Sequence, residues 1–328
     1  MRGARVTAGK TIRRIGWAAA MSVAAFLSFV AGSYRHDLSA ARSRVAAGSK
    51  VAQTACGPIE YADVGSGPVV FAIHGAGGGF DQSLDIAADF LPTGYRLIAP
   101  SRFGYLRTPF PPDSSPAAQA DAHACLLDAL NVPKAIVVGG SMGAPSAMQL
   151  CLRHRERCTG LILLFPIAYA PQRAFAPPSG NGLKVIKTLL GSDFIFWAVS
   201  KFPQDSVMRT LMATPVEDFR AAGPEEQQRA LRTLRHVLPV SLRREGLMSD
   251  SVTSGTIPRY DLEHLAAPTL VLAAEDDLFG TYQGGRYTAE HIPGARFVGY
   301  HTGGHLLLGH REEVKAELAR FLREHAAQ

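Results

Sequence analysis

The sequence lacks the short motifs that usually mark metal and nucleotide sites. It contains no H-E-x-x-H and no C-x-x-C, so no metal-ligand spacing is present. It contains no G-x-x-x-x-G-K-[S/T], which removes the basis for a phosphate-binding P-loop. Only four cysteines occur in 328 residues, which excludes a disulfide-dense scaffold. We therefore expect no metal and no organic cofactor.

Most of the chain has no excess of positive charge. The net charge is +6, but residues 1–50 hold nine Lys/Arg against one Asp. Residues 51–328 hold 25 Lys/Arg and 27 Asp/Glu, a balance of −2. Because a nearly neutral body lacks the basic surface that a phosphate backbone requires, we expect no nucleic-acid partner. No obligate protein partner is evident. Hydrophobic residues make up 47%, enough for a sizeable core.

One long apolar run, residues 15–32, has the length needed to cross a bilayer. Five basic residues precede it, and this positive flank is expected to stay in the cytoplasm while the body is exported. The run is longer than the apolar part of most signal peptides, which favours a retained signal anchor. A signal peptide cleaved after Gly32 (which would leave a secreted or periplasmic protein) and a buried core helix are the alternatives. Residues 33–50 are predicted to be a polar stalk without a core of its own.

From about residue 56, short β-branched runs alternate with helical patterns, which is typical of a mostly parallel sheet with helices on both faces. This alternation predicts an α/β domain over residues 51–328. Strands are expected at 58–64, 69–73, 95–99, 135–138, 161–165, 269–273 and 296–300. Helices are expected at 81–90, 116–130, 144–154, 285–291 and 310–325. Residues 166–262 interrupt the rhythm with helical patterns only, at 184–200, 204–212, 216–221 and 224–236, and are predicted to form an inserted helical cap.

The segment Gly139-Gly140-Ser141-Met142-Gly143 lies between a predicted strand and a predicted helix. This context predicts a sharp turn with the serine at its tip, where flanking glycines let the backbone fold tightly. The following helix directs its first amides and the positive end of its dipole toward the serine. A serine hydroxyl is a weak nucleophile, so it needs a histidine base that a carboxylate orients.

Other loops that follow predicted strands carry the partner residues. His305 follows the strand at 296–300, and Asp276 and Asp277 follow the strand at 269–273. Because parallel strands end at one edge of a sheet, these residues can meet Ser141 there. The glycine-rich loop at 74–79 follows another strand and can offer backbone N–H groups to an oxyanion. The residues alone leave the choice between Asp276 and Asp277 open.

Taken together, these segments resemble the α/β-hydrolase family, in its form with a helical cap. The matching pieces are HGAGGG at 74–79, APSRFGY at 99–105, GGSMG at 139–143, PTLVLAAEDD at 268–277 and GGHLLLGH at 303–310. The resemblance implies an α/β-hydrolase fold, with Ser141 as nucleophile, His305 as general base, Asp277 as the acid, and the amides of Ala76 and Met142 as the oxyanion hole. Ser101 departs from the family pattern, where many relatives carry Asp.

We therefore expect a serine hydrolase that cleaves a small-molecule ester with an apolar acyl or alcohol part. Hydrolysis of a carbon–carbon bond in a diketone-like compound is an alternative, as is a non-catalytic binding member of the same fold. His74 is expected to be structural, and Asp276 to cap the turn that follows it. Residues 243–245 are expected on a solvated surface. Cys56, Cys125, Cys151 and Cys158 are expected as free thiols, with a Cys151–Cys158 bridge as the alternative.

Overall fold

A computed structural model describes residues 2–171, 180–201 and 204–325. Its body is built on one eight-stranded sheet in the order β1-β2-β4-β3-β5-β6-β7-β8. The strands are β1 Lys50–Thr54, β2 Gly57–Val64, β3 Val69–Ile73, β4 Arg96–Pro100, β5 Ala135–Gly140, β6 Cys158–Leu164, β7 Thr269–Ala274 and β8 Arg296–Tyr300. The pairs β1–β2 and β2–β4 are antiparallel and the others are parallel, which confirms a mostly parallel sheet. Strand β1 was not predicted.

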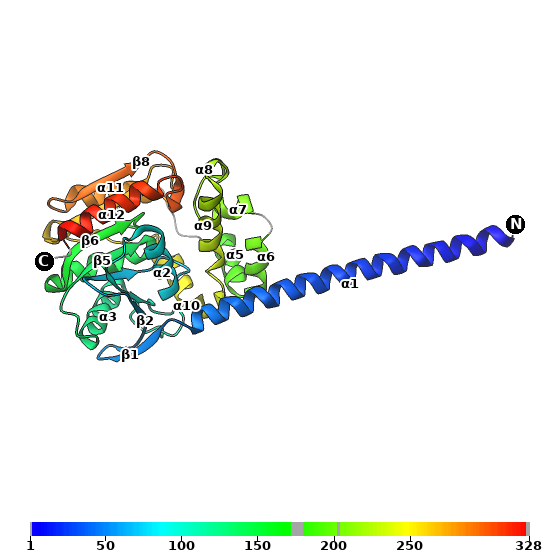
Figure 1. Cartoon of the computed structure of the whole chain (residues 1–328), viewed down its shortest axis with the longest axis horizontal. Coiled ribbons are helices and arrows are strands. Elements are labelled where there is room, and N and C mark those ends of the chain that lie inside the picture. Colours follow the sequence, from blue (N-terminus) through cyan, green and yellow to red (C-terminus); the bar gives the residue numbers. More distant parts are fainter. Residues whose placement is uncertain (1, 172–179, 202–203, 326–328) are drawn as a thin grey trace.

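Helices cover both faces of the sheet, as the alternation of strands and helices predicted (Figure 1). Successive strand residues point to opposite faces, so Phe71 belongs to one core cluster and Val70 to the other. The first cluster packs under α3 Pro116–Ala129, α4 Ala144–Arg153 and α11 Thr281–His291. The second packs under α2 Phe80–Phe90 and α12 Arg311–His325. Every residue of β5 is buried, so the strand that leads into Ser141 lies in the centre of the core.

The described part of the segment between β6 and β7 is helical and forms a cap over one edge of the sheet (Figure 1). Its helices are α5 Asn181–Leu190, α6 Asp193–Lys201, α7 Gln204–Thr210, α8 Val216–Ala221, α9 Pro224–Arg235 and α10 Arg244–Thr253. The single helical pattern expected at 184–200 is two helices, with a break at Gly191-Ser192. Helix α10 was not predicted, since its sequence has no clear apolar stripe.

The N-terminal helix α1 spans Arg2–Ala46 and projects far from the body (Figure 1). Its part from Gly16 to Ala46 is long and apolar enough to cross a membrane, and its most apolar stretch is not buried against any described residue. This result contradicts the alternative of a core helix. The segment expected as a stalk continues α1 as far as Ala46, and its residues Leu38, Ala41 and Val45 are buried. These residues recur every three or four positions and so share one face of the helix.

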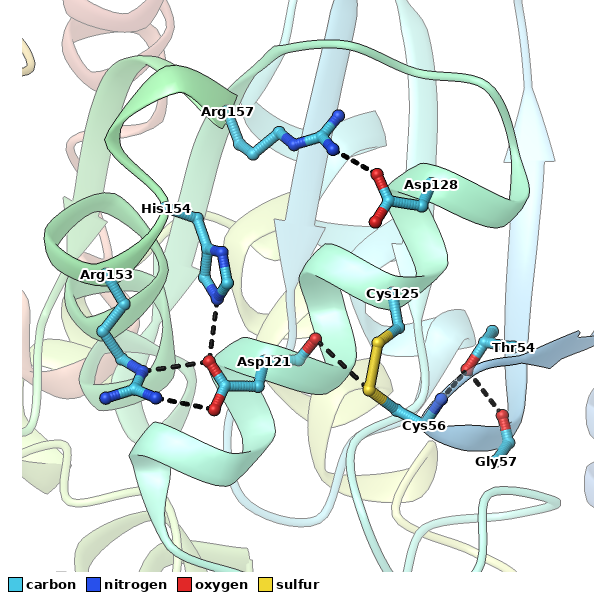
Figure 2. Close-up of a disulfide and its surroundings, with 9 residues drawn as sticks. All are labelled: Thr54, Cys56, Gly57, Asp121, Cys125, Asp128, Arg153, His154 and Arg157. Atoms are coloured by element: carbon cyan, nitrogen blue, oxygen red, sulfur yellow. Dashed lines mark hydrogen bonds and ion pairs between the residues drawn. A yellow bond between two sulfur atoms is a disulfide. The ribbon is translucent and has the colours of Figure 1, made fainter.

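Both cysteine pairs form disulfides, so the expectation of free thiols was wrong. Cys151–Cys158 joins the end of α4 to β6 and matches the alternative that the sequence left open. Cys56–Cys125, which Figure 2 shows, links the β1–β2 hairpin to α3 across 69 positions of sequence. It could not be anticipated because the partner strand β1 was itself missed. The pair sits beside Asp121, whose carboxylate accepts hydrogen bonds from Arg153 on the neighbouring helix.

Candidate active site

Ser141 stands at the tip of a tight turn between β5 and α4. Its φ of 49° lies in the left-handed region, which non-glycine residues rarely adopt. The flanking glycines are required by close contacts: a Cβ at Gly143 would lie 2.4 Å from the carbonyl oxygen of Ile73, and one at Gly139 would lie 2.7 Å from Cβ of Ala147. The backbone strain is of the kind concentrated at functional sites.

The structure brings Ser141, His305 and Asp277 together in one hydrogen-bonded line. His305 Nε2 lies 2.9 Å from Ser141 Oγ, and His305 Nδ1 lies 2.7 Å from Asp277 Oδ2. All three residues are buried, with at most 8% of their surface exposed. The imidazole is held between the rings of Phe165 and Phe279, whose centroids lie 4.8 and 4.9 Å away. The ring therefore has little freedom to leave the line.

Asp277 is held by the turn that follows β7. Its carboxylate accepts hydrogen bonds from the amide of Phe279 at 2.8 Å and from the hydroxyl of Thr281. Thr281 was not predicted as a site residue, because a single threonine four positions after an aspartate is not a distinctive signal. The Phe279 amide binds Oδ1 and the Thr281 hydroxyl binds Oδ2, so the carboxylate is held with Oδ2 toward His305.

Asp276 binds the loop that carries His305, and it does not cap the following turn as expected. Its carboxylate accepts hydrogen bonds from the amides of Gly303 and Gly304, at 3.2 and 2.8 Å, and so supports the loop that carries His305. Asp218 of α8 also accepts from the Gly303 amide, at 3.1 Å. Burial and the neighbouring Asp218 carboxylate raise the pKa of Asp276 from 3.8 to about 6.

The glycine-rich loop at 74–79 follows β3 and lies beside Ser141. The amides of Gly75 and Gly77 donate to Gln82 Oε1 at 2.8 Å and to the hydroxyl of Tyr105 at 3.3 Å. None of the described residues accepts a hydrogen bond from the amide of Ala76. Met142 is the second residue of the helical turn that opens α4, where first amides have no acceptor within the helix. Ala76, Met142 and Ser141 line the same cavity.

His74 has the structural role that the sequence predicted. Its Nδ1 lies 2.7 Å from the carbonyl oxygen of Gly75, and its Nε2 accepts a hydrogen bond of 2.9 Å from the amide of Arg102. Complete burial lowers the pKa of His74 well below 6.5, so the ring stays neutral. A neutral ring with one donor and one acceptor satisfies both neighbours at once.

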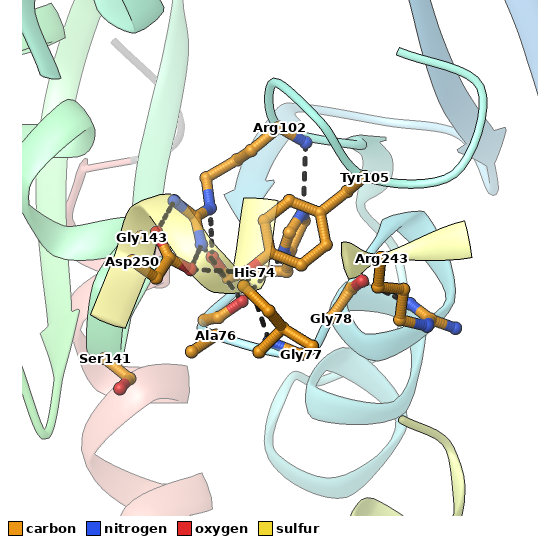
Figure 3. Close-up of polar contacts among 12 residues, drawn as sticks. His74, Ala76, Gly77, Gly78, Arg102, Tyr105, Ser141, Gly143, Arg243 and Asp250 are labelled. Atoms are coloured by element: carbon orange, nitrogen blue, oxygen red, sulfur yellow. Dashed lines mark hydrogen bonds and ion pairs between the residues drawn. The ribbon is translucent and has the colours of Figure 1, made fainter. Parts of the chain in front are cut away.

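A buried ionic cluster behind the glycine-rich loop was not found from the sequence (Figure 3). Arg102 binds the carboxylate of Asp250 on α10, at 3.0 and 2.5 Å, and donates to the carbonyl oxygens of His74 and Gly75. Tyr105 donates its hydroxyl hydrogen to Asp250. Burial and the charge of Asp250 raise the pKa of Tyr105 well above 10, which keeps the phenol protonated as a donor. A cap helix is thereby tied to the loop beside Ser141.

The expectation that residues 243–245 form a solvated surface was wrong for Arg243, whose side chain is completely buried. Its guanidinium donates to the carboxylate of Asp81, at 3.1 and 2.7 Å. It also donates to the carbonyl oxygen of Gly78 (Figure 3). Arg44 of α1 donates to the same carboxylate at 3.2 Å. Burial alone would raise the pKa of Asp81, but the charges and hydrogen bonds of Arg243 and Arg44 together outweigh it and lower that pKa.

A cavity of about 290 Å³ opens from Ser141 and His305 into the cap. Its walls are mostly apolar, and the following residues contribute to them: Ile86, Phe165, Ile167, Ile186, Leu190, Phe196, Leu211, Met212, Val237 and Phe279. Charged residues also line the cavity, among them Asp85, Asp89 and Arg229. Within the described ranges, no group of three or more His, Cys, Asp or Glu side chains could hold a metal ion.

The acidic pair Asp218–Asp276 makes stability depend on pH. The folded-state pKa of Asp276 is raised to about 6, so the folded protein favours the protonated carboxyl group. The contribution of this group to the free energy of unfolding is fully present below pH 3.8 and is lost as the pH rises through about 6. Asp218→Asn removes the like charge and should raise the free energy of unfolding at about pH 8 but change it little at about pH 5. Urea unfolding at both pH values measures this. Glu217→Gln, an exposed acid on the same helix, is the control, and an equal effect of Asp218→Asn at both pH values would contradict the account.

Comparisons with known proteins were consistent across sequence and structure. Residues 68–310 match the family model described as alpha/beta hydrolase fold. An uncharacterized hydrolase of Bacillus subtilis, YcgS, is 26% identical over 76% of this chain and 89% of its own length. A 2-hydroxy-6-oxo-6-phenylhexa-2,4-dienoate hydrolase of Comamonas testosteroni is 28% identical over 75% of this chain and 84% of its own length.

Among solved structures, an alpha/beta hydrolase fold protein from Nakamurella multipartita superposes with a TM-score of 0.65 and 26% identity, covering 85% of this chain and all of its own. An esterase from Exiguobacterium antarcticum superposes with a TM-score of 0.61 at 20% identity, over 85% of this chain and 99% of its own. At that identity the second likeness concerns the fold alone.

Proposed function

The chain belongs to the alpha/beta hydrolase fold family, and on that premise we propose that it is a serine hydrolase that cleaves a small-molecule ester with an apolar acyl or alcohol part. The observation that carries this proposal is the unbroken line from Asp277 through His305 to Ser141, with donor–acceptor distances of 2.7 and 2.9 Å. A buried serine hydroxyl in contact with an oriented imidazole is the arrangement that serine nucleophiles require.

In the proposed reaction, Ser141 Oγ attacks the ester carbonyl carbon while His305 Nε2 takes its proton. Asp277 accepts the hydrogen bond from Nδ1–H and stabilises the imidazolium that forms. The carbonyl oxygen becomes an oxyanion, which the amides of Ala76 and Met142 would hold. His305 then gives its proton to the departing alcohol. A water molecule, deprotonated by His305, attacks the acyl-enzyme, and Ser141 recovers its hydrogen as the acid leaves.

The cavity favours an uncharged, apolar substrate over an anionic one. Among the lining residues that the structure describes, Arg229 is the one cation. Its guanidinium is already bound to the carboxylate of Glu226, at 3.1 and 2.7 Å, and to the carbonyl oxygen of Leu306. Asp85 and Asp89 also line it, and they are paired in turn with His236 and Arg232, so the charged groups of the described lining are already committed to one another.

Carbon–carbon bond hydrolysis is the second candidate, because the Comamonas testosteroni relative is named as a hydrolase of a dienoate. Such a substrate carries a carboxylate, for which the described cavity offers no uncommitted cation. A binding protein without turnover is the third candidate. The orientation of His305 between Ser141 and Asp277 weighs against it, since a binding site has no use for an activated serine.

We also propose that α1 anchors the protein in a membrane with the catalytic body on the extracytoplasmic side. The apolar part of α1 is long enough to cross a bilayer, and the basic residues that precede it favour a cytoplasmic N-terminus. The two disulfides fit export, because disulfides persist in oxidising compartments. Cleavage after Gly32 would instead release the body as a secreted or periplasmic enzyme.

A panel of p-nitrophenyl esters of increasing acyl length tests the substrate class. We expect turnover of the esters, a preference for an apolar acyl chain that the cavity can enclose, and a loss of roughly 10³-fold or more in kcat/KM for Ser141→Ala. The anilide with the same acyl chain and a 2-hydroxy-6-oxodienoate serve as comparison substrates. Rapid cleavage of the dienoate with no ester turnover would replace the ester proposal by carbon–carbon hydrolysis.

Asp277→Asn tests which aspartate orients the imidazole. Asparagine removes the negative charge that stabilises imidazolium and favours the wrong tautomer of His305, so kcat should fall by roughly 10³- to 10⁴-fold. The unfolding temperature should change little. Asp276→Asn is the matched control, since its one amide oxygen can still accept from the Gly304 amide while Asp218 accepts from the Gly303 amide, and it should retain most of the activity. A large loss in Asp276→Asn together with an active Asp277→Asn would move the role to Asp276.

A further inference from the structure

Helix α1 passes from its apolar run into the cap without a linker. It is one continuous helix over Arg2–Ala46. Its described side chains are exposed from Gly16 to Phe29, whereas from Val30 onward one face packs against the cap cluster. The first residues of that face are Val30 and Tyr34, and Leu38, Ala41 and Val45 continue it. The catalytic body therefore cannot swing freely at the end of this helix.

The contact between α1 and the cap is aromatic and ionic. The ring of Tyr34 lies 5.2 Å from that of Phe194 and 5.6 Å from that of Trp197, both on α6. One helical turn later, Asp37 accepts a hydrogen bond of 2.8 Å from Trp197 Nε1 and forms an ion pair of 2.8 Å with Lys201. The ring contacts, the hydrogen bond and the ion pair together hold α6 in one position along α1.

The distance between two aromatic residues on α1 matches the thickness of a bilayer and so indicates where the membrane surface would lie. Trp17 and Tyr34 lie near the two ends of the apolar run, and the 17 residue steps between them span about 26 Å at 1.5 Å per residue. That length is close to the roughly 30 Å of a bilayer's hydrocarbon core. Tryptophan and tyrosine are enriched at the two membrane–water interfaces. Tyr34 therefore marks the interface on the side of the body, and Phe194 lies beside it.

We propose that the cap is seated on the membrane interface at the level of Phe194, and that the enzyme takes a membrane-resident amphiphilic ester from that surface. This inference rests on the proposed membrane anchor and on the proposed hydrolase activity. Phe194 is 45% exposed although it is a large apolar residue. A bilayer interface would cover its open face and would also receive the exposed charge of Arg35, which suits anionic headgroups.

The cap helices next to α1 also line the cavity. Its roof is built from Ile186 and Leu190 of α5 and Phe196 of α6, the helices nearest the interface, and Leu211 follows α7. Figure 1 shows these helices on the side of the body from which α1 departs. Lipid is the favoured occupant over a second protein because the cap surface at Phe194 is continuous with a helix that exposes large apolar residues. Those residues are Trp17, Met21, Phe26, Leu27 and Phe29.

The seating is tested with the full-length protein in phosphatidylcholine–phosphatidylglycerol vesicles that contain a nitroxide-labelled lipid. A bimane fluorophore attached through Phe194→Cys should be strongly quenched. So should one attached through Val185→Cys on α5, an exposed apolar residue that makes none of the contacts between α1 and α6 described above. The control label, through Arg323→Cys in the last turn of α12, should not be quenched, because that helix lies on the side of the body away from α1 (Figure 1). Turnover of a water-soluble ester by each labelled protein shows that it is folded, since none of the three residues lines the cavity.

A flexible insertion tests the supply of substrate from the membrane. About 20 Gly/Ser residues placed between Gly32 and Ser33 have a root-mean-square length of about 25 Å, enough to let the cap leave the surface. The rate of hydrolysis of an ester embedded in the vesicles should then fall, on the order of tenfold, because a flexible linker lowers the effective concentration of the active site at the membrane surface. Hydrolysis of the water-soluble ester should not change.

Each outcome separates the proposals. Recovery of uncleaved protein outside the membrane fraction would overturn the anchor and this inference together, and would leave the hydrolase activity standing. Anchored protein without quenching at Phe194→Cys or at Val185→Cys, which leaves the contacts of α6 with α1 in place, would overturn the seating alone. If the labels are quenched but the Gly/Ser insertion leaves turnover of the embedded ester unchanged, the proposal that the substrate comes from the membrane would be overturned. Absence of turnover on every ester would instead overturn the proposed function.

Discussion

The hydrogen bond between Ser141 and His305 depends on where the parallel strands of the sheet end. Strands β5 and β8 are three positions apart in the sheet, which corresponds to about 14 Å between strand axes. The loops after them close that gap because both emerge at the same edge, with Asp277 supplied by β7 in between. Parallel strand direction is thus the constraint that lets residues 164 positions apart share one proton-transfer line.

The cap contributes to this edge through buried charge. Arg102–Asp250 and Arg243–Asp81 each join a residue near the glycine-rich loop to a residue at or next to α10. Removing one member of such a pair commonly costs about 3–5 kcal/mol, because the remaining charge is left buried and unpaired. Their guanidinium groups also hold the carbonyl oxygens of Gly75 and Gly78. The cap is therefore bonded to the backbone beside Ser141, and α1 joins the same network through Arg44.

Sequence patterns predicted the parts of the molecule that local chemistry determines. The strands of the parallel core are apolar runs bounded by turns, and the Gly-x-Ser-x-Gly turn is defined by neighbouring residues, so both were predicted close to their observed positions. Arg243 was misplaced because its partner Asp81 lies 162 residues away. Cys56–Cys125 was missed because β1 is short and mostly exposed. The apolar face at 30–45 was hidden by charged residues on the other faces of α1.

The central claim is that the line from Asp277 to Ser141 makes this serine a nucleophile, and covalent labelling tests it most directly. Purified full-length protein is treated with a fluorophosphonate and digested, and the modified peptide is identified by mass spectrometry. The account predicts one adduct per chain, on Ser141, and none in folded Ser141→Ala. Folded wild-type protein that takes up no label, or takes it up on another residue, would contradict the claim and favour a binding protein without turnover.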